Sequence, residues 1–399
     1  MIPADWEITT VSEICKLQNG HGFRPPNWSE SGYPIIRIQN LNGNQNFNYF
    51  AGKPEQKWLV PPGQILFAWA GTKGASFGPT IWNGPTGVLN QHIFKVFPAK
   101  GVDKDWLYIA LRHVTDRIEA KAHGFKATLV HVKKSDIDQH GVLVPPLREQ
   151  RYIAKAVATW DRAIETAEAL MANTRLQKQA LMQQLLSGRH RLPGFNGEWQ
   201  RKPINEIATR VTRRNDGTEL PVLTISSTSG FVRQDEKYSR FMAGKSVETY
   251  IMLSEGEFAY NKGNSKTYEF GCVFDLEGYK RALVPHVYVC FKLKKGLSHR
   301  FYKALFEADY LAPQLGRLVN TGVRNNGLLN IKPSEFLGTK VPVPPLDEQE
   351  AIAAVMEAAS RSVIEHEAQL TALRQEKAAL MQQLLTGKRR VKLPESEAA

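Results

Sequence analysis

The chain contains two long stretches in which apolar residues recur every three or four positions. The first runs from Leu147 to Leu186 without a glycine or proline, and a second stretch follows the same register up to Leu385. Two prolines precede the first stretch and Gly188 follows it, as at the start and end of a helix. Each stretch therefore predicts one continuous helix of roughly forty residues, about 60 Å long at about 1.5 Å per residue.

Spacings of four and three residues alternate within each stretch, which is the 3.5-residue period of a coiled coil. Lys178 and Lys377 fall at equivalent seam positions, where a polar residue lowers stability but selects register. The pattern leaves parallel and antiparallel pairing open, and the pair could be a spacer or the core of a helical domain. The predicted seams are Ile153, Val157, Trp160, Ile164, Ala167, Met171, Thr174, Lys178, Leu181 and Leu185, and Ile352, Met356, Ala359, Val363, His366, Leu370, Leu373, Lys377, Leu380 and Leu384.

The whole chain is a repeat. Val-Pro-Pro-Leu-Arg-Glu-Gln at 144–150 returns as Val-Pro-Pro-Leu-Asp-Glu-Gln at 343–349, and Leu-Met-Gln-Gln-Leu-Leu precedes Ser-Gly at 187–188 and Thr-Gly at 386–387. Both matches have an offset of 199, whereas Trp6 matches Trp199 at an offset of 193. The order is globule, helix, globule, helix. The predicted segments are 1–146, 147–188, 189–345 and 346–399, the last being a helix with a basic tail.

The two globules carry short apolar runs interrupted by Gly, Pro and Asn, such as those at 33–38 and 220–225. Runs of this kind predict strands. The clearest helical patterns in the globules are at 106–122 and 297–310. Because strands dominate without regular alternation with helices, the fold class predicted for each globule is α+β.

The charge balance points to a polyanionic partner. The chain has 52 Lys and Arg against 39 Asp and Glu, a formal net charge of +13, and such an excess favours nucleic acid. The three cysteines are far apart and form no C-x-x-C pair, which indicates neither disulfides nor zinc. No signal-peptide pattern or apolar run of membrane length is found, so we expect a soluble, cytoplasmic protein.

Polar loops at matching places in the two globules mix cations, amides and aromatics. Such side chains suit DNA, since Arg and Lys contact phosphates and guanine while Asn and Gln contact adenine. A solvated turn is the alternative interpretation for any one of them. The DNA-binding candidates are Asn19, His21, Arg24, Lys73, Ser76 and Lys126 in the first globule, and Arg210, Arg213, Arg214, Lys262, Asn264, Lys266, Arg324 and Asn325 in the second.

The sequence predicts no catalytic site and no metal site. The two Val-Pro-Pro-Leu segments lack the polar residue and the aromatic of an amino-methylating N/D-P-P-Y/F motif, and no G-x-x-x-x-G-K-[ST] phosphate loop is found. Asp105 with Glu119 and Lys121 fits a loose nuclease pattern, but we expect the last two on an exposed helix. The histidines of the first globule have no H-E-x-x-H spacing.

Val-Pro-Pro-Leu-x-Glu-Gln at the start of a long helix that ends in Leu-Met-Gln-Gln-Leu-Leu-x-Gly, present twice, resembles the specificity subunit (HsdS) of type I restriction-modification systems. The resemblance spans the whole chain. It implies that each globule is a target recognition domain for one half of a split DNA site, and that the two helices form an antiparallel coiled coil that sets the gap.

The resemblance also implies partners: two methyltransferase subunits (HsdM) and the motor-nuclease subunits (HsdR). AdoMet, ATP and Mg²⁺ would then belong to those partners, with no cofactor in this chain. One departure is that Trp160-Asp161 of the first helix corresponds to Ala359-Ser360 in the second, so the two partner surfaces need not bind equally. Two other functions stay open: a stand-alone DNA-binding adaptor or regulator, and a nuclease with an unrecognised site.

Overall fold

The computed structural model describes residues 2–121, 129–237, 244–263, 265–319 and 329–394. The chain forms two compact units: unit 1 comprises 1–167 and 369–399, and unit 2 comprises 168–368. Each unit contains the start of one long helix and the end of the other. These units cut the helices, so the four-segment division expected from the sequence stays a prediction.

Unit 1 is built on an antiparallel sheet with the strand order β2-β10-β6-β8. All four residues of β6 are buried, because both faces of the sheet are covered. Ile65 and Phe67 pack with α3 (Lys104–Lys121) in one cluster, while Leu66 and Ala68 pack in a second cluster under another small sheet. The strands are β2 Cys15–Asn19, β10 Ile93–Pro98, β6 Ile65–Ala68 and β8 Gly78–Ile81.

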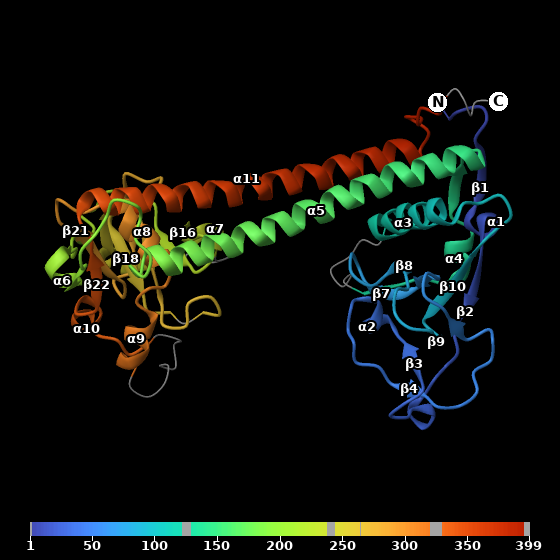
Figure 1. Ribbon diagram of the computed structural model, residues 1–399, viewed down its shortest axis with the longest axis horizontal. Coiled ribbons are helices and arrows are strands. Elements are labelled where there is room, and N and C mark those ends of the chain that lie inside the picture. The colour runs from blue at the N-terminus through green and yellow to red at the C-terminus, as the bar shows by residue number, and fades with distance from the viewer. Residues whose placement is uncertain (1, 122–128, 238–243, 264, 320–328, 395–399) are drawn as a thin grey trace. The chain divides into compact units, whose positions relative to one another are not determined.

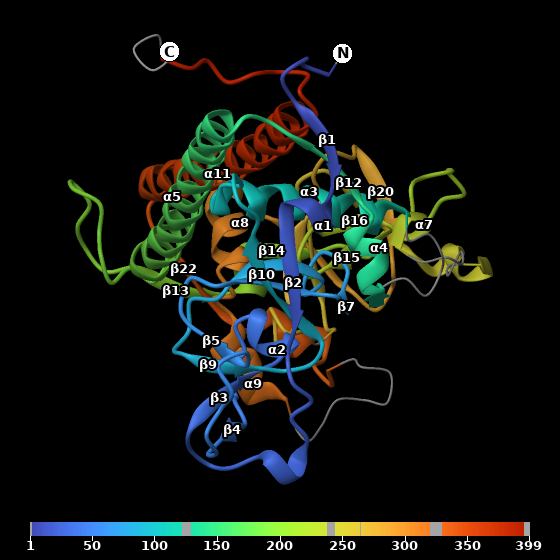
Figure 2. The ribbon, with the colours of Figure 1, turned by 90° about the vertical axis from the view of Figure 1, so that its right-hand side faces the viewer.

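The second sheet of unit 1 has the order β4-β3-β9-β5, and two-stranded ribbons join β1 to β12 and β7 to β11. Figure 2 shows β1 and β12 side by side, close to the start of α5 (Leu147–Leu185). These elements are β1 Glu7–Thr10, α1 Val11–Ile14, a 3-10 turn Pro25–Asn27, β3 Tyr33–Ile36, α2 Ile38–Leu41, β4 Tyr49–Phe50, β5 Leu59–Val60, β7 Ala70–Thr72, β9 Gly87–Leu89, α3 Lys104–Lys121, β11 Leu129–His131, α4 Lys134–Asp138 and β12 Gly141–Val144.

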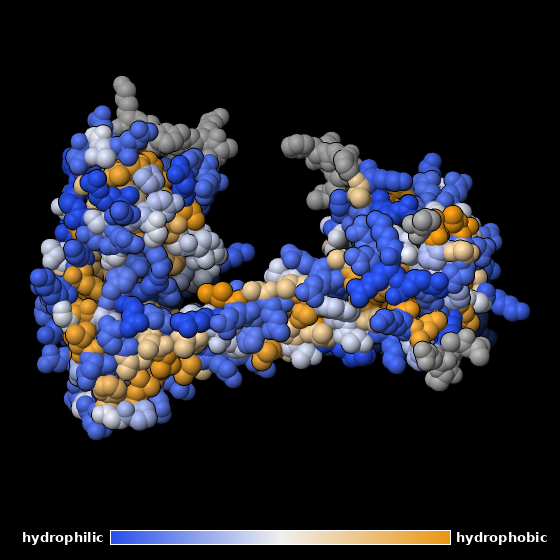
Figure 3. Space-filling view, turned by 90° about the horizontal axis from the view of Figure 1, so that it is seen from above, coloured by the Kyte–Doolittle hydropathy of each residue, from blue (hydrophilic) through white to orange (hydrophobic). Residues whose placement is uncertain are grey.

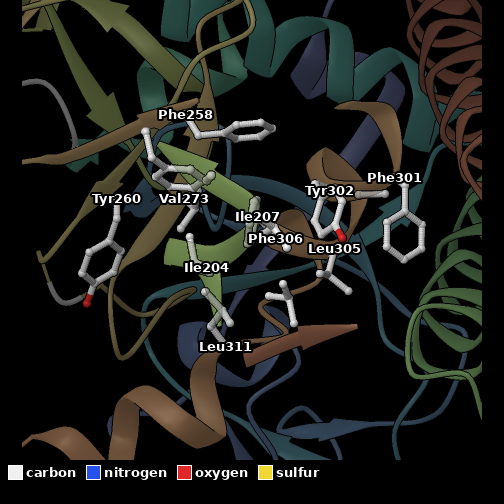
Figure 4. Close-up of a cluster of buried hydrophobic side chains, with 14 of the residues drawn as sticks. Ile204, Ile207, Phe258, Tyr260, Val273, Phe301, Tyr302, Leu305, Phe306 and Leu311 are labelled. Carbon is white, nitrogen blue, oxygen red and sulfur yellow. The ribbon is translucent and has the colours of Figure 1, made fainter. Parts of the chain in front are cut away.

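Unit 2 repeats the central sheet in the order β14-β21-β18-β19. Figure 4 shows side chains of its core, where Phe258 and Tyr260 of the sheet share a cluster with Phe301, Tyr302 and Phe306 of α8. The elements are β13 Gln200–Pro203, α6 Ile204–Ile207, β14 Ala208–Arg210, β15 Leu223–Ser226, β16 Gly230–Arg233, α7 Gln234–Lys237, a 3-10 helix Gly244–Thr249, β17 Ile251–Ser254, β18 Phe258–Asn261, β19 Cys272–Asp275, β20 Arg281–Val284, β21 Val289–Leu293, α8 His299–Glu307, α9 Ala312–Leu318, α10 Pro333–Leu337 and β22 Lys340–Val343.

The α+β prediction and both helical patterns in the globules are confirmed, the latter as α3 and α8. The two long helices are also confirmed, as α5 (Leu147–Leu185) and α11 (Leu346–Leu385). No helix in the described part of the chain has the length and apolar character that a membrane crossing requires.

Within each unit, α5 and α11 pack antiparallel (Figure 1). In unit 1, Lys377 forms an ion pair with Asp161, while Leu384 packs in the cluster that contains Ile153. Every predicted seam residue on both helices is buried or half-buried, as the coiled-coil pattern requires. Outside the seam the helix surface mixes hydrophilic and apolar residues (Figure 3).

The repeated Glu of the Val-Pro-Pro-Leu-x-Glu-Gln motif is buried at the junction between globule and helix. In unit 2, Glu348 is fully buried, its carboxylate accepts the indole N–H of Trp199 at 2.9 Å, and Arg191 donates two hydrogen bonds to it at 2.6 and 2.7 Å. In unit 1, Glu149 accepts from Trp6 at 3.1 Å and from Arg390 at 2.6 and 3.1 Å.

Each arginine follows the end of one long helix and holds the start of the other. Arg390 also binds Asp5, and its hydrogen bonds to Glu149 and Asp5 raise the pKa of the guanidinium. Part of the predicted basic tail is thus fixed in an ion-pair network of unit 1. A buried carboxylate with several charge-assisted partners is well satisfied, which gives the motif a structural reason.

The neighbouring Gln of each motif is buried as well. Gln150 donates to the carbonyl of Pro145 at 2.9 Å and accepts the N–H of Asp103, which begins the turn into α3, at 2.8 Å. Gln349 does the same with Pro344 at 2.8 Å and with Ser298, the N-cap of α8, at 2.9 Å. The motif therefore joins the helix of each globule to the start of a long helix.

The glycine that follows each long helix has a left-handed backbone, with φ +73° at Gly188 and +68° at Gly387, as predicted for a C-terminal cap. A Cβ on Gly188 would lie 2.9 Å from the Trp199 ring, and one on Gly387 would lie 2.5 Å from Pro3. Both the conformation and the close approach exclude a larger residue.

Candidate nucleic-acid interface

The strand register of unit 1 places three polar loops at one end of its central sheet. Asn19 at the end of β2 lies opposite Phe94, and Ala68 at the end of β6 lies opposite Ile93. The chain leaving β2, the turn after β6 and the turn before β10 therefore meet at the same end. The β1–β12 ribbon, which leads into α5, joins the opposite end through α1.

Unit 2 brings its corresponding loops together in the same way. Arg210 at the end of β14 lies opposite Phe291, and Tyr260 near the end of β18 lies opposite Val289. The segment 211–215, the turn after Asn261 and the turn before β21 meet at one end of the sheet. In each unit, two of the loops selected separately from the sequence are thus brought together with a turn that was not selected.

In unit 1 this surface is rich in rings. The imidazole of the exposed His21 stacks on Trp58 with ring centroids 4.2 Å apart, and Trp69 contacts His92 and His131 edge to face at 5.1 and 4.9 Å. The exposed Gln91 side chain lies within 3.2 Å of the His92 ring. Amides and rings held in this way suit contacts with base edges and sugars.

Two features fix these loops. A Cβ on Gly20 would lie 2.1 Å from the carbonyl oxygen of Asn90, so the chain leaving β2 can press against the turn before β10 only with a glycine there. The turn after β7 is held by α3: Glu119 accepts the N–H of Gly74 at 2.8 Å, and Lys73 donates to the Glu119 carbonyl at 2.9 Å.

Ser76 is buried, and its hydroxyl accepts the Thr72 N–H at 2.7 Å, so it supports the turn from inside. Asn19 is exposed, and so is Arg24, which lies further along the same segment before the 3-10 turn. The DNA contacts assigned to these residues remain predictions. Lys126 lies outside the described residues.

In unit 2 the corresponding surface is cationic. Arg210 and Arg214 are exposed, and Lys266 is exposed on the turn after β18. Arg213 instead pairs with the buried Glu257 and donates to Ser254 at 3.2 Å, which gives it a supporting position in the fold.

The backbone carbonyl of Lys262 accepts the N–H of Leu329 at 3.0 Å, so the chain near Leu329 reaches the turn after β18. Lys262 itself is half-buried. Asn264, Arg324 and Asn325 lie outside the described residues. The sequence-predicted cations that are described thus lie at or beside one end of the sheet.

Sequence reasoning did not select Trp58, Gln91, His92 or His286 as candidates. Gln91 and His92 precede β10 in a short turn, and His286 occupies the equivalent turn of unit 2, before β21. The signal that could have found them is their position relative to the repeated strands: once β10 and β21 are aligned, these turns must lie beside the candidate loops.

The structure does not assemble the nuclease pattern. Asp105 lies in the first turn of α3 and Glu119 in its last turns, and fourteen residues of helix separate them by about 21 Å. The expectation that Glu119 is exposed is wrong: its side chain is buried because it holds the Gly74 turn. Within the described ranges, no group of three or more His, Cys, Asp or Glu side chains could hold a metal.

The cysteines are also poorly suited to chemistry. All three are buried, and burial raises the pKa of the Cys15, Cys272 and Cys290 thiols to about 12. A thiol with so high a pKa is not a nucleophile near neutral pH. The candidate loops thus form two unlike surfaces on two equivalent sheets, with side chains of the kinds that suit contacts with a polyanion.

The fold and the two loop clusters are those expected of a recognition protein with two pseudo-equivalent candidate surfaces. Comparison with known proteins agrees. Residues 3–172 match the family model of the type I restriction modification DNA specificity domain. The resemblance to the specificity subunits of type I restriction-modification systems, predicted from the repeated motifs, is thereby confirmed.

Two proteins with similar sequences are named as type I restriction enzyme specificity subunits. It is 26% identical over 168 residues to the type I restriction enzyme EcoBI specificity subunit of Escherichia coli, covering 41% of this chain and 34% of that subunit. It is 23% identical to the putative type I restriction enzyme MjaX specificity subunit of Methanocaldococcus jannaschii, covering 98% and 95% of the two chains.

Solved structures share the fold along its length. The S subunit from M. genitalium matches with a TM-score of 0.53 at 13% identity, covering 98% of this chain and 97% of that one. A chain from a structure on complex assembly and conformational transition of the type I R-M system matches with a TM-score of 0.61 at 15% identity, covering 96% and 98%. The repeated globule-and-helix architecture is therefore confirmed.

Proposed function

We propose that this chain is the sequence-specificity subunit of a type I restriction-modification complex and carries no catalytic site of its own. Each unit reads one short block of a split DNA site with the loops at the end of its central sheet. The observation that carries the proposal is the convergence of the candidate loops on the same end of two equivalent sheets, in a chain with an excess of positive charge.

Partner subunits would carry out the methylation and cleavage reactions. Two methyltransferase subunits would bind AdoMet, and restriction subunits would use ATP and Mg²⁺ for translocation and cleavage. This chain would bring both to the recognised site, in the cytoplasm where the DNA lies. The junction residues support this division, because the repeated motif is explained by burial and hydrogen bonding rather than by chemistry.

The first experiment is co-expression of the chain with the methyltransferase gene nearest to its own, purification through a tag on this chain, and mapping of methylated adenines across the host genome. A stable complex and a motif of two short blocks around a fixed unspecified gap are expected. If no complex forms and no split motif appears, the alternative is a stand-alone DNA-binding adaptor or regulator. Selection of DNA sites with the isolated chain then tests that alternative.

We also propose that the lengths of α5 and α11 set the gap between the two blocks. Insertion of seven residues near Glu168 in α5 and at the facing level of α11 keeps the seam in register. Each helix lengthens by about 10 Å, which is about three base-pair steps at about 3.4 Å each. The preferred gap is expected to grow, and an unchanged gap would contradict the role as a ruler.

A further inference from the structure

A groove of about 490 Å³ lies in unit 1 between the start of α5 and the end of α11. Its apolar floor includes Ala156, Leu380 and Leu384, and Lys155 lies on its rim. Further cations come from the segment after α11, and none of the lining residues is acidic. Those cations are Arg389, Lys392 and the Arg390 that already pairs with Glu149.

The repeat allows this groove to be compared residue by residue with unit 2. At the offset of 199 its floor is kept, since Ala156, Leu380 and Leu384 correspond to Val355, Leu181 and Leu185. The rim is not kept. The positions of Lys155, Arg389 and Lys392 are occupied in unit 2 by Ala354, His190 and Pro193.

The starts of the two long helices differ in charge in the same direction as the rims: the start of α5 is more basic and the start of α11 more acidic. The first sixteen residues of α5 include four basic and two acidic residues, whereas those of α11 include one basic and four acidic residues. The acidic face of unit 2 is matched by Arg300 of α8, which pairs with Glu350 and Glu357. Asp103 of unit 1 is equivalent to Ser298, because each donates its backbone N–H to the glutamine of its motif. This pairing places Asp105 of unit 1 at the position of Arg300.

We propose that the unit 1 groove docks an acidic segment of the methyltransferase subunit through an apolar anchor, and that the equivalent face of unit 2 binds the same segment less tightly. The inference rests on the proposed function and adds the chemistry and order of partner binding. A floor present in both units suits two copies of one partner. A basic rim present only in unit 1 strengthens one of the two contacts.

A protein segment fits this groove better than DNA. Apolar side chains form its floor, whereas a phosphate backbone is bound by cations and polar groups. The groove also lies at the helix junction, and the candidate loops of unit 1 lie at the opposite end of the central sheet from the ribbon that leads into α5.

The test titrates the methyltransferase subunit from the methyltransferase gene nearest to that of this chain into the full-length chain, and follows both binding steps by native mass spectrometry at low and high salt. The wild type is expected to load in two separated steps, the tighter one weakened by salt. The triple variant Lys155→Ala, Arg389→Ala, Lys392→Ala should weaken the tighter step about tenfold, as expected for three partly exposed ion pairs. The pair His190→Arg, Ala354→Lys should strengthen the weaker step several-fold.

The matched control is Lys16→Ala, Lys100→Ala, Lys133→Ala, which removes the same charge from exposed positions of unit 1 that do not line the groove. It should leave both steps unchanged, and all variants should melt as the wild type does. Equal steps in the wild type, or an unaltered tighter step in the groove variant, would overturn the inference. So would a groove variant that loses DNA affinity alone. A wild type that binds no methyltransferase at any salt contradicts the proposed function itself.

Discussion

The ends of the two central sheets differ far more than the junctions behind them. At the junctions both units use the same tryptophan, glutamate and arginine. At the sheet ends, unit 1 presents His21, Trp69 and Gln91, whereas unit 2 presents Arg210 and Arg214. The repeat therefore preserves the residues that join each globule to the long helices and varies the side chains that the loops present. Junction changes should therefore act on stability, and loop changes on DNA recognition.

The largest effect is expected from Glu348→Ala. Arg191 and Trp199 would lose their buried acceptor, and breaking a buried charge pair costs about 3–5 kcal/mol of unfolding free energy. Glu149→Ala should cost less, because the side chain of its partner Arg390 is 45% exposed against 21% for Arg191. Denaturant unfolding of each variant measures both values.

The control for this pair is Glu365→Ala, which removes an exposed carboxylate from the same helix as Glu348 and should change stability little. Glu348→Gln keeps an acceptor for the indole and should recover part of the loss. Equal, small losses for Glu348→Ala and Glu365→Ala would show that the repeated motif is kept for another reason.

The second prediction concerns equivalent positions at the two sheet ends, His21 and Arg214. Arg214→Ala should weaken DNA binding about tenfold and lower the salt dependence of binding by about one counterion, if its guanidinium contacts a phosphate. His21→Ala should change base preference more than salt dependence. Affinity measured over a salt series with matched and mismatched sites separates the two, and similar salt slopes for both variants would contradict the comparison.

The helices and the repeat could be predicted from the sequence because a 3.5-residue period and two nearly identical copies of a motif are strong signals. Glu149 and Glu348 belong to the repeated motif that the sequence shows. Their partners Arg390 and Arg191 follow the end of the other long helix, and no local sequence pattern predicts this pairing. Antiparallel pairing came only with the structure and the family resemblance.

The candidate sites show the same limit. Asn19 and Lys73 were found because charged and amide-rich turns are visible in sequence, but Gln91 became a candidate only when strand register placed its turn beside them. Arg213 looked like its neighbours in sequence, whereas the structure pairs it with Glu257, a residue 44 positions away. Long-range pairing of this kind decides which cations face outward.

The third prediction tests the support of the unit 1 loops. Glu119→Ala leaves the N–H of Gly74 without its acceptor and should cost about 1 kcal/mol. The freed turn should lower discrimination between DNA sequences more than overall affinity. The variant also addresses the nuclease alternative, because metal-dependent cleavage by the wild type that disappears in Glu119→Ala would reinstate it. No cleavage by either protein is expected.

The smallest effect is expected from a change in the paired long helices. Lys377 pairs with Asp161 in unit 1, whereas in unit 2 the position equivalent to Asp161, beside Lys178, is Ser360. Ser360→Asp should give Lys178 an acidic partner on the facing helix, in addition to its electrostatic interaction with Glu307, and should stabilise unit 2 by about 0.5 kcal/mol, since a half-exposed ion pair is worth little. Asp161→Ser should destabilise unit 1 by a similar amount, and the gain and loss should both shrink at high salt. Thermal melts at low and high salt measure this. A Ser360→Asp variant less stable than the wild type would mean that the two seams differ in geometry, and not only in the charge beside each lysine.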